Sequence, residues 1–422
     1  MVSQWSFLLC LLALVGATIS LDRQALGGDA PPSDPRASFA DKARQYFTDE
    51  ELATGRAYAR GRYLLYGARI ALTLGLFGLL TLSPLSAKIR DLSVSVAGGR
   101  VWLTIGIFGL LLALLYYVVT FPVSLYGSFL REHTFGLSRQ TFVAWAWDYA
   151  KGALINAVIL LPLLILLYTF IRWDPVRWYL PVWVVVVLVM SLLAELSPIL
   201  FDPLFHTFRP VQNTALVERL RTLTARAGLT VGPILEMDAS RKTTKTNAYF
   251  TGFGRTRRIV LYDTLLTASA PEEVELVVAH ELGHWRRHHI WKGMAISAVS
   301  ALAALWLIAR LLNIAADSGR FGFIHPADPR SLPLLLLLLV ALTILTMPIQ
   351  MAISRSFERE ADRESLRLTA NPKAFIASEI TLARSNLADI DPPRVVVWLL
   401  YTHPPVLERI AMAEAFRAEQ GQ

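Results

Sequence analysis

The chain has 422 residues, 54% of them hydrophobic, and a formal net charge of +8. A mean hydropathy of +0.45 is too high for an ordinary soluble protein and indicates a membrane protein with several spans. The basic excess suits cytoplasmic loops that face anionic membrane lipids, and the sequence shows no basic-aromatic module that would indicate nucleic-acid binding. The single cysteine, Cys10, excludes an intrachain disulfide.

Seven apolar runs are candidates for membrane spans. The first, residues 5–19, is short and could be a retained span or the apolar region of a signal peptide. We favour a span because no Lys or Arg precedes it. Residues 47–60, ahead of the second span, are expected to be helical and to lie near the membrane surface. The other six runs are residues 63–82, 101–123, 153–170, 178–193, 291–314 and 332–353.

Arg69 lies inside the second predicted span. An arginine at membrane depth faces protein or water rather than lipid, so Arg69 is expected to line a hydrated cavity or to extend toward the interface. The sequence leaves both alternatives open.

Positive charge is distributed unevenly between the two ends of these spans. With seven spans, 31 Lys and Arg residues lie on one side, in residues 20–62, 124–151, 194–290 and 354–422, and 7 lie on the other side. Because Lys and Arg concentrate in cytoplasmic loops, the long 194–290 loop and the C-terminus are expected to face the cytosol.

The long loop is expected to contain its own secondary structure. Residues 214–227 form an amphipathic pattern with Leu216, Leu220 and Leu223 on one side. Residues 233–237 are typical of a strand. Residues 247–250 and 258–262, separated by a glycine-rich turn, predict a β-hairpin.

A His-Glu-x-x-His motif follows the hairpin, within an apolar helical run. On a helix, His280 and His284 share one face about one turn apart, so both can bind one Zn²⁺. Glu281 stands beside them and can take a proton from the attacking water. Ser269 and Glu272 are expected to form a capping box at the start of this helix.

A catalytic zinc site needs a third protein ligand and an open fourth position. Glu358 follows the seventh span on the same membrane side as the motif, and Glu360 and Glu364 are its rivals. Asp362 lies one turn beyond Glu358, where it could orient a ligating histidine by a hydrogen bond.

Together these segments resemble the CAAX prenyl protease 1 family. The resemblance implies seven membrane helices around a large water-filled chamber, with one zinc ion at its cytosolic end and Glu358 as third ligand. It also implies that Asn247 and His403 lie beside the metal and that Arg409 reaches the peptide or the oxyanion. The matching segments are residues 124–141, 203–205, 247–250, 258–266, 280–284, 357–362 and 403–409.

Simple chemistry is consistent with these implied roles. His403 and Arg409 can donate to the oxygen that becomes negative during peptide hydrolysis. Asn247 begins a strand that can pair with an extended substrate. The family motif gives His288 and His289 no role, and we interpret both as surface residues.

The predicted fold is an all-α, multi-pass membrane protein with a zincin-like catalytic portion that contains a small hairpin. Residues 1–200 would form a membrane domain with five spans. Residues 201–422 would form a zinc metalloprotease domain that includes the last two spans and a helical tail.

The predicted activity is zinc-dependent cleavage near the C-terminus of CAAX-type, prenylated substrates, by a monomer in contact with membrane lipids. One alternative is a broad quality-control protease of the HtpX type, and a less favoured one is a transporter or receptor with a structural metal. The C-terminal residues 418–422 show no endoplasmic-reticulum retrieval signal, which suits a bacterial inner-membrane protein, with the endoplasmic-reticulum membrane as the alternative.

Overall fold

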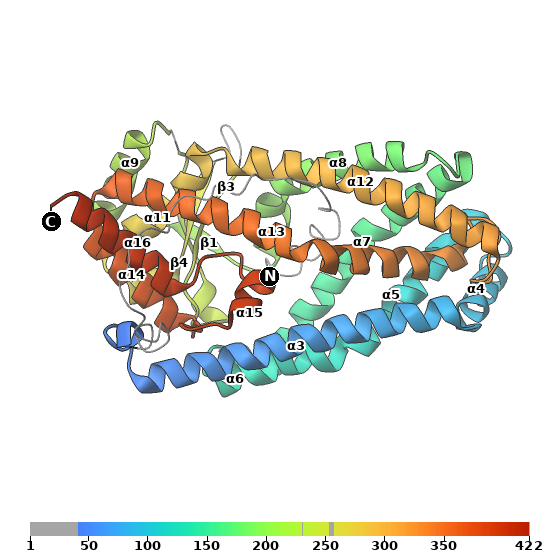
Figure 1. Ribbon diagram of the computed structural model, residues 1–422, viewed down its shortest axis with the longest axis horizontal. Helices are drawn as coiled ribbons and strands as arrows, with labels where there is room; N and C mark the ends of the chain where they lie inside the picture. Colours follow the sequence, from blue (N-terminus) through green and yellow to red (C-terminus); the bar gives the residue numbers. More distant parts are fainter. Residues whose placement is uncertain (1–40, 230, 253–256, 422) are drawn as a thin grey trace, which may run out of the picture.

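The computed structural model describes residues 41–229, 231–252 and 257–421 (Figure 1). This part of the chain is chiefly helical and contains one small sheet. Long helices run along the molecule, and the sheet lies with the shorter helices at one end. The α-helices are α3 (Asp49–Leu82), α4 (Leu85–Val96), α5 (Val101–Leu125), α6 (Arg131–Thr134), α7 (Phe142–Trp173), α8 (Tyr179–Leu196), α9 (Thr214–Arg226), α10 (Asp263–Ala268), α11 (Pro271–Arg286), α12 (His289–Ser318), α13 (Leu332–Thr369), α14 (Pro372–Ser385), α15 (Arg394–Leu400) and α16 (Val406–Glu419).

The described residues contain six helical segments long and apolar enough to cross a membrane. They correspond to the second to seventh predicted spans, whereas the first predicted span, residues 5–19, lies outside the described residues. The segments are Asp49–Leu82, Val101–Thr134, Phe142–Trp173, Tyr179–Leu204, His289–Ser318 and Pro329–Thr369.

Residues 49–60 are helical, as predicted for 47–60, and they form the first part of the long helix α3. Thr48 and Glu51 form a capping box at its start, with each side chain bonded to the other residue's backbone N–H. No proline or new cap follows Arg60, so the helix continues unbroken into the span.

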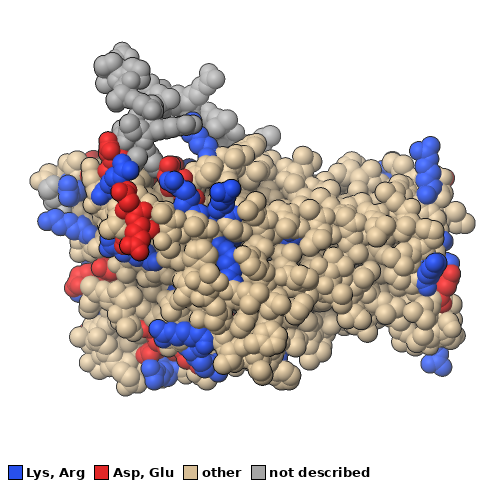
Figure 2. All heavy atoms as spheres, turned by 90° about the horizontal axis from the view of Figure 1, so that it is seen from below, with Lys and Arg blue, Asp and Glu red and all other residues tan. Residues whose placement is uncertain are grey.

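Charged side chains gather at the two ends of the long helices. Figure 2 shows a broad band between these ends that carries few charges, as a surface in contact with lipid requires. At the end away from the sheet, Arg90 of α4 lies 3.5 Å from Asp328 in the α12–α13 connection. Connections predicted to share one membrane side therefore meet at one end of the structure.

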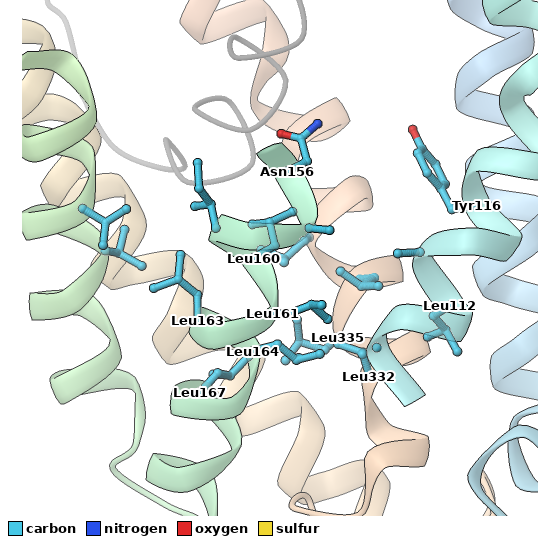
Figure 3. A pocket seen from close by; sticks show the side chains of 18 of the residues that line it. Leu112, Tyr116, Asn156, Leu160, Leu161, Leu163, Leu164, Leu167, Leu332 and Leu335 are labelled. Atoms are coloured by element: carbon cyan, nitrogen blue, oxygen red, sulfur yellow. The ribbon is translucent and has the colours of Figure 1, made fainter. Parts of the chain in front are cut away.

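The spans enclose a cavity of about 590 Å³. Its wall is mainly apolar, and Figure 3 shows leucines of α5, α7 and α13 around it, with Asn156 and Tyr116 among the polar exceptions. Arg69 also lines the cavity and donates a 2.7 Å hydrogen bond to Ser124 Oγ. Of the two alternatives for Arg69, the structure therefore supports the cavity wall.

Four short strands form one mixed sheet in the order β1-β2-β4-β3. The predicted hairpin is present as the antiparallel β3–β4 pair, with Tyr249 opposite Val260. The sheet is larger than predicted, because β2 pairs parallel with β4, and β1 pairs antiparallel with β2. The three residues of β1 are too few to show an alternating pattern. The strands are β1 (Phe208–Pro210), β2 (Ile234–Met237), β3 (Ala248–Thr251) and β4 (Arg258–Tyr262).

The predicted amphipathic helix is α9, and its apolar side packs against the sheet and α11. Leu216, Leu220 and Leu223 are at most 4% exposed and belong to one core with Ile259 and Leu261 of β4. Burying leucines of this kind contributes on the order of 1.5–3 kcal/mol each. This core fixes α11 in place.

Helix α11 packs closely on α13 at Gly283. A Cβ atom at this position would lie 2.8 Å from the backbone oxygen of Ala361 and 2.9 Å from its Cα. Only glycine permits this separation. Gly283, which directly precedes the motif histidine His284, therefore sets the distance between α11 and α13.

Gly283→Ala is expected to destabilise the protein by about 1–3 kcal/mol, because backbone atoms must move to admit the methyl group. Gly293→Ala in α12 is the matched control, since a Cβ there meets nothing within 4 Å. That control should be neutral or stabilising, by up to about 1 kcal/mol. Thermal unfolding in detergent measures both, and equal stability of the two variants would contradict this packing.

Candidate metal centre

Helix α11 carries both predicted histidine ligands. The Nε2 atoms of His280 and His284 lie 3.2 Å apart, on the same side of the helix. Val274 and Val278 are each 1% exposed and pack into the core with α9 and β4. Their burial fixes the rotation of the helix about its axis, so that both imidazoles face α13.

The predicted capping box at Ser269 and Glu272 is wrong. Ala270 is the N-cap residue of α11, with no side-chain cap, and Ser269 ends the preceding helix α10. The Ser269 hydroxyl is therefore one residue too early in the chain. Glu272 instead accepts a 2.5 Å hydrogen bond from Arg219, which ties α9 to α11.

Helix α13 supplies the third predicted ligand. Glu358 is 7% exposed, and its Oε2 lies 3.2 Å from His280 Nε2, while its Oε1 lies 3.5 Å from His284 Nε2. One ligand atom from each of the three residues lies within 4.8 Å of the others. The structure therefore brings the three predicted ligands together.

These residues fit a catalytic metal. Two imidazoles and one carboxylate are a donor set that Zn²⁺ accepts, and three protein ligands leave a fourth position for water or substrate. Glu358 Oε2 is buried and forms no well-directed hydrogen bond within the described part of the chain, although the Nε2 atoms of His280 and His403 lie 3.2 and 3.1 Å away. A buried carboxylate oxygen without a well-directed donor is costly, and a divalent cation would remove that cost.

The two rival glutamates make other contacts. Glu360 Oε2 lies 3.1 Å from His289 Nε2, and Glu364 Oε1 accepts a 2.5 Å hydrogen bond from Arg286.

The interpretation of His289 as a surface residue is wrong, because it is only 5% exposed. His288 is exposed, as expected.

Asp362 contacts His280 from the side away from Glu358. Its Oδ1 lies 2.8 Å from His280 Nδ1, and the residue is fully buried. A carboxylate in this position holds the proton on Nδ1 and leaves Nε2 free to bind a metal. This is the arrangement predicted for Asp362.

Arg409 of α16 binds two buried carboxylates. Its Nε donates to Asp362 Oδ2 at 2.8 Å, and its Nη1 lies 2.6 Å from Glu379 Oε2. Burial raises the pKa of Glu379 to about 7, although Arg409 opposes this shift. Sequence reasoning missed Glu379, because α14 gives no motif that distinguishes it from an exposed helical glutamate. The oxyanion role implied for Arg409 stays a prediction.

Asn247 and His403 border one small cavity of about 100 Å³, together with His280, Glu281 and Arg409. His403 Nε2 lies 3.1 Å from Glu358 Oε2, and its side chain is 54% exposed. A half-exposed imidazole in this place can meet a substrate.

Asn247 stands at the start of β3, the last strand in the sheet order. Its side-chain oxygen accepts a 2.9 Å hydrogen bond from the backbone N–H of Ala248. A terminal strand can add a further extended segment along its free edge.

Glu281 directly follows the metal ligand His280 and borders the cavity of about 100 Å³. Burial raises its pKa above the usual range, and the nearby histidines oppose this shift. A carboxylate with a raised pKa is a stronger base than an exposed one, which is the property that proton transfer near neutral pH requires.

Two family models cover nearly the whole chain. The model described as peptidase family M48 matches residues 210–417, and the model described as CAAX prenyl protease N-terminal, five membrane helices, matches residues 34–207. The metalloprotease YhfN of Bacillus subtilis, itself uncharacterised, is 30% identical over 390 residues, 92% of this chain and 91% of that protein. The chain belongs to peptidase family M48.

Other relatives of this M48 chain carry the name of the family predicted from the motifs. CAAX prenyl protease 1 of Saccharomyces cerevisiae is 28% identical over 319 residues, 71% of this chain and 70% of that protein. The human CAAX prenyl protease 1 homolog is 28% identical over 349 residues, 71% of each chain. The predicted family resemblance is thereby confirmed.

A solved structure confirms the fold. The crystal structure of S. mikatae Ste24p superposes with a TM-score of 0.81 at 23% identity, over 98% of this chain and 97% of that one. The M48 chain is therefore a metalloprotease built into a multi-pass membrane protein.

Arg409→Met is expected to destabilise the metal-free protein by about 3–5 kcal/mol, because it leaves Asp362 and Glu379 buried without their cation. The control is Arg417→Met, at an exposed position of the same helix. Thermal unfolding after chelator treatment compares the two. A variant that unfolds at the wild-type temperature but has lost activity would instead assign Arg409 to the substrate.

Proposed function

We propose that this M48 metalloprotease is a zinc-dependent endopeptidase that cleaves CAAX-type, prenylated substrates near their C-terminus. The observation that carries the proposal is the cavity of about 100 Å³ shared by His280, Glu281, Asn247, His403 and Arg409. The base Glu281, the metal ligand His280 and the hydrogen-bond donors His403 and Arg409 thus border one space that can admit a peptide bond.

The chemistry divides between one metal ion and the residues around it. A zinc ion held by His280, His284 and Glu358 would polarise the peptide carbonyl and make water more acidic. Glu281 accepts the proton of the attacking water and passes it to the leaving amine. His403 donates to the developing oxyanion.

The substrate would reach this site in an extended form. Strand β3 lies beside α11, so a peptide paired with its free edge runs past Glu281. The apolar cavity of about 590 Å³ among the spans offers a place for a prenyl chain attached to that peptide. Water must also reach the metal, and Arg69 and Asn156 are polar groups on the wall of that cavity.

The proposal extends to the organisation of the protein. Residues 1–200 would form the membrane domain and residues 201–422 the protease domain, a division supported by the two family models that meet near residue 208. The excess of Lys and Arg on the side of the motif supports a cytosolic active site. A monomer in a bacterial inner membrane, with the endoplasmic-reticulum membrane as alternative, is the simplest form.

The mainly apolar cavity also suits the alternative of a quality-control protease of the HtpX type, which would accept unprenylated membrane segments. A transporter or receptor with a structural metal is less well supported, because a structural site closes all four positions with protein ligands.

Glu281→Gln is expected to retain one zinc per chain and to lose nearly all peptide cleavage, because the amide keeps the shape of the side chain but cannot take a proton. Glu218→Gln on the exposed side of α9 should keep both zinc and activity. Metal analysis and single-turnover cleavage in detergent measure the two properties. Full cleavage by Glu281→Gln would remove the general base from the mechanism.

A prenylated CAAX peptide is expected to be cleaved with a kcat/KM more than about tenfold above that of the same peptide without the lipid. Burial of only two CH₂ groups, at about 0.8 kcal/mol each, would suffice for this ratio. A folded soluble protein should be cleaved least. Faster cleavage of an unprenylated, misfolded membrane protein than of the prenylated peptide would favour the quality-control alternative.

A further inference from the structure

His284, the later of the two motif histidines, contacts His289, which belongs to no motif. Its Nδ1 lies 3.0 Å from His289 Nδ1, and His289 Nε2 lies 3.1 Å from Glu360 Oε2. The His289 ring stacks on Phe357 with their centroids 4.4 Å apart and an interplanar angle of 7°. Glu360 and Phe357 together hold the buried His289 imidazole in one orientation.

A break in the helix brings His289 to this place. Helix α11 ends at Arg286, and His288 adopts a left-handed conformation with φ 56° before α12 begins at His289. In an uninterrupted helix, the residue five positions after His284 would lie about 140° around the axis. The left-handed residue turns the chain so that His289 returns to the side of His284.

The proton positions follow from these contacts. His284 Nε2 faces His280 and Glu358, so it is the atom available to a metal and must carry no proton. The proton of neutral His284 is then on Nδ1 and is donated to Nδ1 of His289. His289 therefore carries its own proton on Nε2, which donates to Glu360.

We propose that His289 and Glu360 are positioning residues that fix the tautomer and the ring orientation of His284 for metal binding. The proposal rests on the proposed zinc site. It gives each ligating histidine a different support, since His280 is held by Asp362 directly and His284 is held by a carboxylate acting through a second imidazole. Partners of this kind typically change metal affinity by about ten- to hundredfold.

The test measures zinc affinity, by competition with a chromophoric chelator, and the visible spectrum of the Co²⁺-substituted protein. Because Ala at position 289 keeps no acceptor for His284, we expect His289→Ala to weaken zinc binding by about ten- to hundredfold and to shift the Co²⁺ bands. His289→Asn should recover part of the affinity, because its side-chain oxygen can accept where Nδ1 did. The control His288→Asn should match wild type, since Asn tolerates the left-handed conformation.

Thermal unfolding of the metal-free variants separates positioning from packing. Zinc binding by His289→Ala as tight as by His288→Asn would overturn the proposal. It would also be overturned if Ala and Asn at position 289 lowered metal-free stability equally and left the Co²⁺ spectrum unchanged, because the ring would then serve only to pack on Phe357. If wild type itself bound no stoichiometric zinc, the proposed function would fail and this inference with it.

Discussion

The contact between α11 and α13 determines whether the site exists at all. The two ligating histidines come from one helix, and Glu358 and Asp362 come from the other. Gly283 allows the helices to approach until a Cβ would collide with the backbone of Ala361. The hairpin of two spans, α12 and α13, returns the chain to this contact, so the fold of the membrane part directly sets the ligand geometry.

Charge balance explains why so many ionisable groups are buried together. Glu358, Asp362 and Glu379 are carboxylates with at most 7% exposure, and Arg409 is the cation that contacts two of them. With neutral histidines, the ionised Glu358 and Asp362 leave an excess of one negative charge over Arg409, and this excess rises to two when Glu379 is also ionised. A divalent cation would neutralise it. Burying such an excess without a counter-ion would cost several kcal/mol. The protein therefore provides an electrostatic site for a metal as well as its ligand atoms.

The sequence predicted the parts of this architecture that depend on strong local patterns. Long apolar runs gave the six spans that lie within the described residues, and the period of Leu216, Leu220 and Leu223 gave α9. The predictions that failed depend on tertiary context. Ser269 satisfies the spacing of a capping box but belongs to the end of α10. His289 was interpreted as a surface residue because the family motif gives it no role, and its burial depends on the break in the helix at His288. Glu379 has no local signal, because its burial depends on how α14 packs against α11 and α16.

The ligands lie where two spans meet the protease portion, and the edge strand β3 packs beside the helix that carries two of them. The apolar cavity lies farther along the spans, and none of the three ligands lines it. This arrangement would bring a lipid-anchored peptide and water to the same metal. The most direct test of the account is X-ray absorption at the zinc edge, combined with metal stoichiometry of the full-length protein in detergent. The account predicts one zinc per chain with two imidazoles, a carboxylate and one exchangeable light-atom ligand. A site closed by four protein ligands, or a protein without stoichiometric zinc, would contradict it.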